Sequence, residues 1–411
     1  MTIQVDPVGA AENNGILVVG TGPTGLAAAL ALSRLGKKVA LVGPPPRRDD
    51  SRTTALMRPA IEFLDRLGVG EALRSIAAPL STMRIVDATS RLIRSPTVTF
   101  RASEIGEEFF GLNIPNAALN ETLAKAVRAD SAILWRERMV AGWATAAGHV
   151  EVMLDDGETI IADLAVAADG RNSSAREAAG ISVRTKSLHQ SALVLNFGHA
   201  RHHGFTSTEL HTEFGPCTQV PLPGGFRSSL VWVMRPSDAE ALAALDDEAL
   251  SRRVEARHQS FLGKVSVEPG RQVYPLASIQ PSRFAARRIA LVGEAAHVFP
   301  PITAQGLNLG MRDVMDLVDN VGRHPQDPGS DAVLQDYEAM RRPDILARSS
   351  AVNLVNASLL SSMLPAQLAR SAGLTMLEAI PPLRAFFMRE GMYPGSGFSA
   401  LLPSRFRRSV S

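Results

Sequence analysis

The chain has 411 residues, 45% hydrophobic and 20% charged, a composition typical of a folded protein of two modest domains. Its 43 Lys and Arg residues against 41 Asp and Glu residues give a net charge of +2, which argues against a nucleic-acid partner. Cys217 is the only cysteine, so an intrachain disulfide and a multi-cysteine metal site are excluded, and no metal site is expected. We expect a reducing compartment and a place in the core for Cys217.

The N-terminal segment has neither the basic start nor the apolar run of a secretory signal. A membrane span needs about 20 apolar residues. The longest run without charge, residues 349–369, is interrupted by Pro365 and by several polar residues. We therefore expect a cytoplasmic protein.

The first elements predict a nucleotide-binding unit. Residues 15–43 have the pattern of a strand, a glycine-rich turn, an apolar helix and a second strand, which together form a βαβ unit. Helical patterning follows at residues 54–67 and again at residues 116–128. Both helices are expected to lie against the sheet.

The pattern then changes to strands. A strand at 132–135, a hairpin turning at Asp156-Gly157 and a buried strand before Asp169 continue the same domain. From about 187 to 274, short alternating runs separated by Gly and Pro turns predict an antiparallel sheet.

A buried strand at 287–293 and a helix near 308–321 return the chain to the first domain, so the antiparallel sheet is predicted to be inserted within it. From Asp331 onward the pattern is helical, with Pro-rich joints. The predicted divisions are 1–81, 102–186 and 285–345 for the nucleotide-binding domain, 82–101 and 187–284 for the substrate domain, and 346–411 for a helical C-terminal region.

Gly20, Gly22 and Gly25 form a G-x-G-x-x-G motif between the first strand and its helix. Glycine there allows a pyrophosphate to approach the backbone, and the helix N-terminus offers free N–H groups and a positive dipole end. Pro23 and Thr24 lie within the same turn and are predicted to contact the ligand. The alternative is that these glycines serve only tight packing.

The second strand lacks one expected feature. It ends at Gly43, where an acidic residue normally accepts the ribose hydroxyls of a dinucleotide. Asp49 and Asp50 lie just downstream as possible substitutes. Either a different group holds that ribose or nucleotide binding is weaker than usual, and the sequence does not decide which.

Three motifs together resemble the aromatic-ring flavoprotein monooxygenases, and within that family the hydroxylases of ubiquinone biosynthesis. They are GTGPTG at 20–25, AADGRNSSAR at 167–176 and GEAAHVFPPITAQGLNLGMRDV at 293–314. The resemblance implies an α/β fold: a Rossmann-type FAD-binding domain with an inserted antiparallel β-sheet substrate domain and a helical C-terminal region. It also implies FAD as cofactor, molecular oxygen as co-substrate, and NADH or NADPH as electron donor.

The resemblance assigns contacts to the later motifs. Asp169 and Gly170 would contact FAD and the pyridine-nucleotide region, although an Asp there can also cap a helix. Glu294 stands where the family more often has Asp, and its carboxylate can still accept ribityl or ribose hydroxyls. The loop 303–308 opens a helix whose N–H groups would favour negative charge on a reduced flavin. The contacts predicted there are Gln305, Gly306, Leu307 and Asn308.

Smaller matches concern five further residues. Arg52, in DSRTTAL, would meet the flavin or its phosphates, and Asn116 would face the cofactor; the alternatives are an exposed Arg and a helix cap. His297 is a candidate catalytic residue, but a lone His beside a cofactor loop more often packs or forms hydrogen bonds. Pro300 is a second candidate catalytic residue, and Pro300 and Pro301 are expected to fix the path of the loop, with their carbonyls free to face the substrate. The flavin itself can carry the oxygen chemistry.

The function implied by the resemblance is an FAD-dependent monooxygenase that hydroxylates an electron-rich ring through a flavin hydroperoxide. The favoured substrate is a polyprenylated phenol of ubiquinone biosynthesis. The alternatives are a soluble hydroxylase of a small phenolic compound, a catalytically silent FAD-fold assembly subunit, and a nicotinamide-only dehydrogenase. Candidates for an apolar lining over the flavin, for which an ordinary core position is favoured, are Phe109, Phe110, Leu193, Leu195, Leu230 and Trp232.

A polyprenyl tail would bring the substrate from a bilayer. The C-terminal region has apolar residues at helical spacing, Leu354, Val355, Leu359 and Leu360, and ends with Arg405, Arg407 and Arg408. These residues would suit peripheral contact with the inner face of a membrane or with other ubiquinone-biosynthesis proteins. A helical pair packed on the FAD domain or on a second subunit is an equal alternative.

Overall fold

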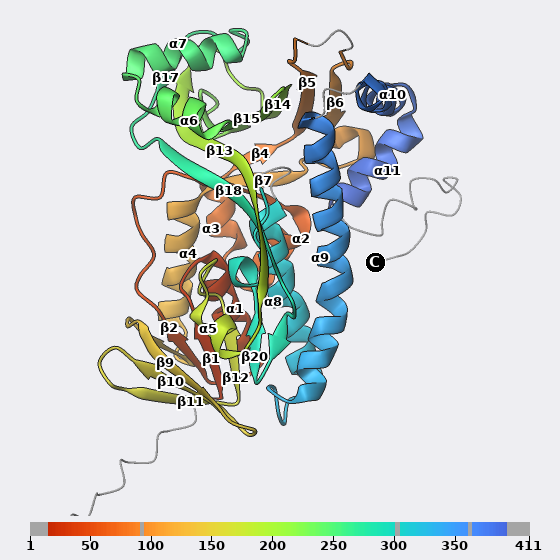
Figure 1. Ribbon diagram of the computed structural model, residues 1–411. Helices are drawn as coiled ribbons and strands as arrows, with labels where there is room; N and C mark the ends of the chain where they lie inside the picture. The colour runs from red at the N-terminus through yellow and green to blue at the C-terminus, as the bar shows by residue number, and fades with distance from the viewer. Residues whose placement is uncertain (1–14, 91–93, 301–304, 361–363, 393–411) are drawn as a thin grey trace, which may run out of the picture.

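A computed structural model describes residues 15–90, 94–300, 305–360 and 364–392 (Figure 1). In these residues, β1 (Ile16–Val19), α1 (Pro23–Ser33) and β2 (Val39–Val42) form the predicted βαβ unit, and the two strands pair in parallel. They belong to a six-stranded sheet that is parallel except for its β19–β20 edge. Its order is β19 (Ala285–Ala286), β20 (Ile289–Leu291), β12 (Leu164–Ala167), β1, β2 and β8 (Ile133–Arg136).

The segment 54–67 is not one helix as predicted. Residues Thr53–Met57 form β3, which pairs antiparallel with β7 (Gly111–Pro115), and β7 in turn pairs with β4 (Ala78–Leu80). The helix α2 begins only at Arg58 and ends at Arg66. Pro59 lies in its first turn, where backbone N–H groups have no partner within the helix, so proline is tolerated there and favours a helix start at this point. The preceding residues are free to extend and pair as a strand.

The predicted hairpin at Asp156-Gly157 is present. It joins β10 (Val150–Leu154) to β11 (Thr159–Ala162), and with β9 (Val140–Thr145) these strands form a separate three-stranded sheet. The helices of this part are α3 (Gly70–Ser75), α4 (Asn116–Ala129) and α5 (Ser174–Ala178).

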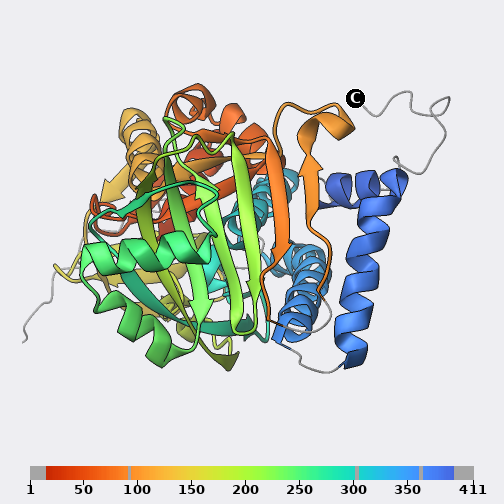
Figure 2. The ribbon, with the colours of Figure 1, turned by 90° about the horizontal axis from the view of Figure 1, so that it is seen from above.

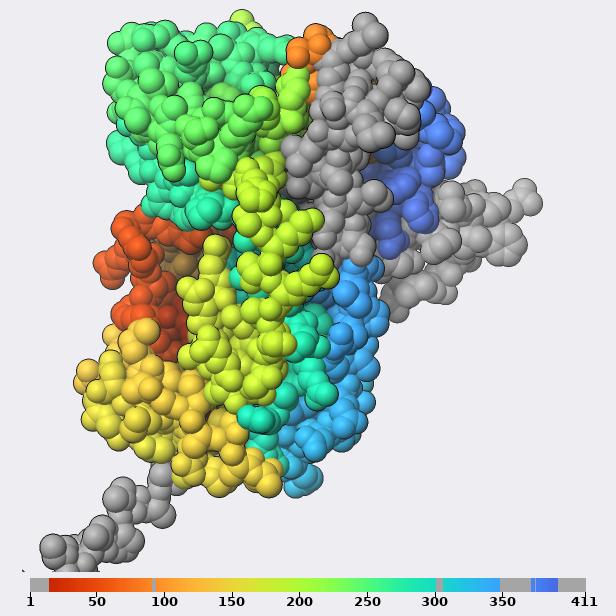
Figure 3. Space-filling model, in the orientation of Figure 1, coloured from red at the N-terminus to blue at the C-terminus, as the bar shows by residue number. Residues whose placement is uncertain are grey.

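A sheet of eight strands lies in the upper part of the molecule in Figure 1, and the space-filling view in the same orientation shows residues of this part in green at the top (Figure 3). Its pairs are antiparallel as predicted, except for the parallel pair β5–β14. The 17-residue strand β13 runs upward from the part of the molecule that contains the six-stranded sheet, and it pairs with β18 along much of its length. The part with the six-stranded sheet is the one expected from the sequence to bind FAD, and it is called the FAD part below. The strands are β5 (Thr82–Asp87), β6 (Val98–Arg101), β13 (Val183–His199), β14 (Thr206–Thr212), β15 (Gly215–Pro221), β16 (Arg227–Met234), β17 (Val265–Val267) and β18 (Gln272–Pro281). The exact domain boundaries stay a proposal.

Two helices that the sequence analysis did not predict, α6 (Pro236–Ala243) and α7 (Asp247–Arg257), cover one face of this sheet (Figure 2). Leu193, Leu195, Leu230 and Trp232 lie in the core beneath these helices, together with Cys217, so they are ordinary core residues. Burial raises the pKa of the Cys217 thiol well above its usual range.

The opposite face of the sheet turns toward the FAD part. It carries the alternate residues of β13: Val194 packs beside Tyr274, and Asn196 donates a hydrogen bond from Nδ2 to the Ser51 carbonyl (2.9 Å). Phe109 packs against the core of the FAD part, whereas Phe110 lies in a small cluster with Met388.

The C-terminal region is helical. The helix α8 (Gln305–Arg323) packs against α1, and α9 (Asp331–Leu360) runs along α8. The helices α10 (Leu364–Ala379) and α11 (Pro381–Met392) lie beside β5 and β6, next to the short helix η1 (Ala102–Ile105) (Figure 2). Among the described helices, none is long and apolar enough to cross a membrane.

Candidate active site

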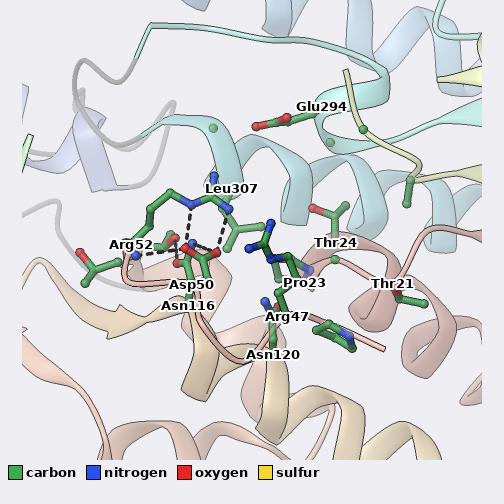
Figure 4. A pocket seen from close by; sticks show the side chains of 18 of the residues that line it. Thr21, Pro23, Thr24, Arg47, Asp50, Arg52, Asn116, Asn120, Glu294 and Leu307 are labelled. Atoms are coloured by element: carbon green, nitrogen blue, oxygen red, sulfur yellow. Dashed lines mark hydrogen bonds and ion pairs between the residues drawn. The ribbon is translucent and has the colours of Figure 1, made fainter. Parts of the chain in front are cut away.

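A cavity of about 610 Å³ lies between α1, the loop after β2, α4 and the short helix η2 (Gly293–Ala295) (Figure 4). Gln272 and Tyr274 of β18 also line it, so the substrate sheet supplies one wall. Its volume falls within the range of roughly 300–1,000 Å³ found for ligand pockets. The predicted cofactor residues that line it are Gly22, Pro23, Thr24, Arg52, Asn116, Gly170, Glu294, Gly306 and Leu307.

The three glycines of the first motif serve different purposes. A Cβ atom on Gly20 would lie 2.2 Å from the Ala168 carbonyl oxygen, and one on Gly25 would lie 1.9 Å from the Gly20 oxygen. These two glycines therefore allow close packing of β1, α1 and the end of β12. Gly22 has open space where its Cβ atom would be, and it borders the cavity at the N-terminus of α1.

The packing at the end of β2 explains why position 43 has a glycine and not the acidic residue that usually binds the ribose. Gly43 has φ +146°, and its Cβ atom would lie 2.9 Å from Cγ2 of Thr21. The Thr21 hydroxyl also donates to the Pro44 carbonyl. A longer side chain at position 43 would require Thr21 to move, so the usual carboxylate cannot be accommodated there in this arrangement.

Asp50, Arg52 and Asn116 form a connected group at the cavity (Figure 4). Arg52 donates from Nε and Nη2 to Asp50 (2.8 and 2.7 Å), and Asn116 donates to the same carboxylate (3.2 Å). Burial alone would raise the pKa of Asp50, but the hydrogen bonds and charge of Arg52 outweigh it, so the pKa is lowered. Asp50 therefore stays ionised near neutral pH and holds Arg52 at the cavity wall.

Asp49 is the other possible substitute for the missing acid. It also lines the cavity, but both of its carboxylate oxygens accept hydrogen bonds from Arg47 (3.0 and 2.8 Å).

The second and third motifs are joined by Arg176. This buried side chain donates to the carbonyls of Ala295 (3.0 Å) and Arg171 (2.9 Å). Gly170 borders the cavity, whereas Asp169 does not line it and accepts a hydrogen bond from the Ala175 N–H group (3.2 Å) at the start of α5. Glu294 lines the cavity and is ion-paired with Arg171 at 3.5 Å.

At the start of α8, Gly306 and Leu307 line the cavity. Asn308 does not; its amide accepts from Met57 N–H and donates to the Ala55 carbonyl (both 2.8 Å), which fastens α8 to β3. The predicted loop residues Thr303 and Ala304, with Pro301, and the Gln305 side chain lie outside the described part of the structure.

His297 is buried and does not line the cavity. Its Nε2 lies 2.7 Å from Asp313 Oδ2, and the other oxygen of Asp313 accepts from Arg341 Nε (2.8 Å). Burial alone would lower the pKa of Arg341, but the charge of Asp313 and other acids raises it. This network joins two residues of the third motif to Arg341 of α9, so it supports the motif from the side away from the cavity. Pro300 is likewise buried.

Comparison with known proteins agrees with this geometry. A family described as "FAD binding domain" matches residues 14–348. The chain is 33% identical to "Ubiquinone hydroxylase UbiL" of Rhodospirillum rubrum over 92% of this chain and 89% of that protein. The chain belongs to the FAD-dependent aromatic-ring monooxygenases, in the subfamily of ubiquinone-biosynthesis hydroxylases.

Two further matches extend this family relationship. The chain is 28% identical to "3-demethoxyubiquinol 3-hydroxylase" of Escherichia coli K12 over 88% of this chain and 94% of that protein. Its fold is similar to the crystal structure of p-nitrophenol 4-monooxygenase PnpA from Pseudomonas putida DLL-E4, with a TM-score of 0.75 and 20% identity. That similarity covers 94% of this chain and 98% of the other.

The residues present fit the FAD of this monooxygenase family. Gly22, Gly170 and Gly306 border the cavity, and none has an atom within 4 Å of where its Cβ atom would be. Because these glycines have no Cβ atom, the backbone at all three positions is open to the cavity, and a dinucleotide can approach it closely. The N-termini of α1 and α8 both meet the cavity, and both suit anionic groups.

Several lining residues were missed by the sequence analysis. Asn120 follows Asn116 by four positions on α4, and this spacing could have predicted a place on the same helix face. Gln272 and Tyr274 gave no sequence signal, because only the tertiary fold brings β18 to the cavity. The other missed residues are Pro44, Pro45, Pro46, Arg47 and Val292, and Thr21, Thr53, Thr54, Ala168 and Gly293 lie in the quoted motifs but were not predicted as contacts.

Proposed function

We propose that this FAD-dependent monooxygenase hydroxylates the aromatic ring of a polyprenylated phenol in ubiquinone biosynthesis, with NADH or NADPH as electron donor. One observation carries the proposal: three motifs far apart in the sequence border one cavity, and the inserted sheet supplies one further wall of it. The names of the relatives support the choice of substrate class.

Bound FAD would supply the redox and oxygen chemistry. The chain supplies position and environment. Gly22 and Pro23, at the N-terminus of α1, would hold the pyrophosphate, and Glu294 would accept hydroxyl groups of the cofactor. The N-terminus of α8, where Gly306 lines the cavity, would favour the anionic charge of a reduced flavin through its positive dipole end.

The inserted sheet would exclude water. Val194, Val231 and Tyr274 lie together on the face that turns toward the FAD part. These side chains would keep water out of the site in which the cofactor and the substrate ring meet. His297 needs no proton-transfer role in this scheme, because its ring is tied to Asp313 away from the cavity.

The proposal can be tested in two steps. The purified protein should contain reducible FAD, and NADH or NADPH should reduce it. Deleting the gene in the source organism should cause a prenylated ring lacking one oxygen to accumulate, and restoring the gene should reverse this. An unchanged quinone pool, in a strain without a second hydroxylase, would favour a small soluble phenol as substrate. A protein that retains NAD(H) but no flavin would favour the dehydrogenase alternative, and bound FAD that never turns over would favour the silent subunit.

We further propose that the corner between α10 and α11 contacts an anionic lipid surface. Met376, Ile380 and Phe387 are exposed there by 50%, 40% and 51%. The sequence beyond α11, residues 393–411, contains Arg405, Arg407 and Arg408 and no acidic residue. Exposed apolar side chains that are followed in the sequence by a basic segment suit a membrane surface that supplies a polyprenylated substrate.

Flotation with vesicles of phosphatidylglycerol and phosphatidylcholine tests this contact. Changing the three apolar residues to Ser should reduce binding at least about fivefold, because apolar area and charge act together. The control is the double variant Met139→Ser and Met153→Ser, which changes similarly exposed residues of the β9–β10 hairpin. Equal binding by both variants and the wild type would reject the contact, and self-association lost only in the triple variant would identify a second copy as the partner.

A further inference from the structure

Asn120 is a buried polar residue that the motifs do not explain. It lies on α4, its residue is 8% exposed, and it lines the cavity. Its Oδ1 atom is buried and has no hydrogen-bond partner in the described structure. In Figure 4 its side chain points from α4 into the cavity. Buried amide groups nearly always have partners, so an exception beside a cavity calls for a ligand.

Asp169 Oδ1 and Asn196 Oδ1 are also buried without a partner in the part of the chain that the structure describes, but neither residue lines the cavity. Two other polar groups of the cavity wall, Asn116 and Asp49, are already held. Asn116, one turn earlier on α4, is held by Thr54 (2.7 Å) and by Asp50 (3.2 Å). Both carboxylate oxygens of Asp49 accept hydrogen bonds from the guanidinium group of Arg47. Of Asn116, Asp49 and Asn120, only Asn120 therefore has a side-chain oxygen, Oδ1, that accepts no hydrogen bond from the described residues.

The position of Asn120 indicates which part of a dinucleotide it meets. The same cavity is lined by Pro23 at the start of α1 and by Pro44 after β2. In a βαβ unit, this region holds the adenosine ribose and the adjoining phosphate. It is also the region where Gly43 replaces the usual carboxylate and Thr21 fills the space.

We propose that Asn120 hydrogen-bonds a ribose hydroxyl in the adenosine half of FAD, and so performs the task of the acid that is absent at Gly43. This inference rests on the proposed function, namely that the cavity binds FAD. The neutral amide of Asn120 provides a hydrogen-bond acceptor without adding a negative charge near the pyrophosphate. Rotation of the amide group by 180° would place its NH₂ donor there instead of its oxygen. Asn120 is a binding residue in this proposal, with no part in the oxygen chemistry.

The test measures binding to the apoprotein, with FAD and with ADP, which carries the adenosine half alone. Flavin fluorescence reports the binding of FAD, and calorimetry reports the binding of ADP. Asn120→Leu keeps a similar volume but removes the amide, and should weaken both ligands about tenfold, the loss expected for one hydrogen bond whose partner is left unpaired. Asn120→Asp keeps an acceptor and should bind both within about threefold of the wild type.

Asn320→Leu is the matched control. Asn320 is also buried with an unpartnered Oδ1, but it lies on α8 and does not line the cavity. This variant should bind FAD and ADP as the wild type does. Thermal unfolding of each apoprotein checks the fold, and apo Asn120→Leu should unfold no lower than the wild type, because it loses an unsatisfied buried amide.

Each other result overturns a defined part of the inference. Unchanged binding by Asn120→Leu would show that the amide contacts no ligand and is satisfied by a buried water molecule. Loss of FAD binding without loss of ADP binding would move the contact to the flavin half. A large loss in Asn120→Asp would indicate contact with a phosphate oxygen. If the wild-type apoprotein itself binds no FAD, the proposed function fails instead.

Discussion

Replacing the glycines of the first motif one at a time should separate folding from cofactor binding. Gly20→Ala would force a side chain onto φ +112° and onto the Ala168 carbonyl, where the Cβ atom would lie only 2.2 Å away. Positive φ costs roughly 1–2 kcal/mol for an L-residue. The overlap with backbone adds to that cost, so we expect a loss of at least about 3 kcal/mol.

Gly22→Ala should behave differently. Gly22 has φ −70°, and its Cβ atom would have no neighbour within 4 Å. The apoprotein should therefore lose no more than about 1 kcal/mol, the usual cost of Ala at a helix N-cap. The added methyl group would stand in the cavity where the pyrophosphate approaches. FAD affinity should fall at least about tenfold, or roughly 1.4 kcal/mol.

Urea unfolding of the apoproteins and FAD titration by flavin fluorescence measure the two effects separately. The reasoning predicts an unstable Gly20→Ala, and a stable Gly22→Ala that binds poorly. Wild-type affinity in Gly22→Ala would refute the assignment of this glycine to the cofactor site. Wild-type stability in Gly20→Ala would refute the account of close packing at the end of β12.

Two further predictions concern buried charges. Burial lowers the pKa of His258 to about 4, below the value of 6.5 in an unfolded chain. The unfolded chain therefore binds a proton at a higher pH than the folded protein does. The contribution of the neutral, buried His258 to the free energy of unfolding is fully present above pH 6.5 and is lost as the pH falls toward 4. His258→Phe, beside Phe197, should flatten the pH dependence of the unfolding free energy by at most about 3 kcal/mol, and an unchanged slope between pH 6.5 and 4.5 would count against this. Arg341→Met removes the buried cation that pairs with Asp313, leaves that carboxylate with His297 and the Gly293 N–H group as its described partners, and should cost about 3–5 kcal/mol in urea unfolding. The control Arg342→Met removes a partly exposed ion pair with Glu338 and should cost less than about 1 kcal/mol; equal losses would contradict the argument.

The sequence predicted best where local chemistry alone decides the structure. The βαβ unit at 15–43 follows from apolar periodicity and from glycines that no other residue can replace. The strand β3 was mistaken for part of a helix, because its pairing with β7 is a tertiary contact between residues far apart in the chain. Alternation identified the two faces of β13, but not which face α6 and α7 would cover.

The same limit applies to the site. Gly22 and Glu294 lie within recognisable motifs and line the cavity as expected. Asn308 also lies in a motif, but its amide is used to fasten α8 to β3. Tyr274 reaches the cavity from another domain, and sequence spacing carries no information about such an approach. Motifs thus predict which segments gather at a site, whereas the contacts of each side chain depend on the fold.

Because the cavity wall is built from segments far apart in the chain, cofactor binding should affect how stable and how abundant the protein is in a cell. Pro23, Asn120, Tyr274 and Glu294 come from segments that span most of the chain, so one bound cofactor would tie them together. A ligand present at a hundred times its dissociation constant adds about 2.7 kcal/mol to the stability of the folded state. Protease sensitivity and steady-state abundance should therefore follow the supply of riboflavin, and a flavin-starved cell would lose the protein itself as well as its activity.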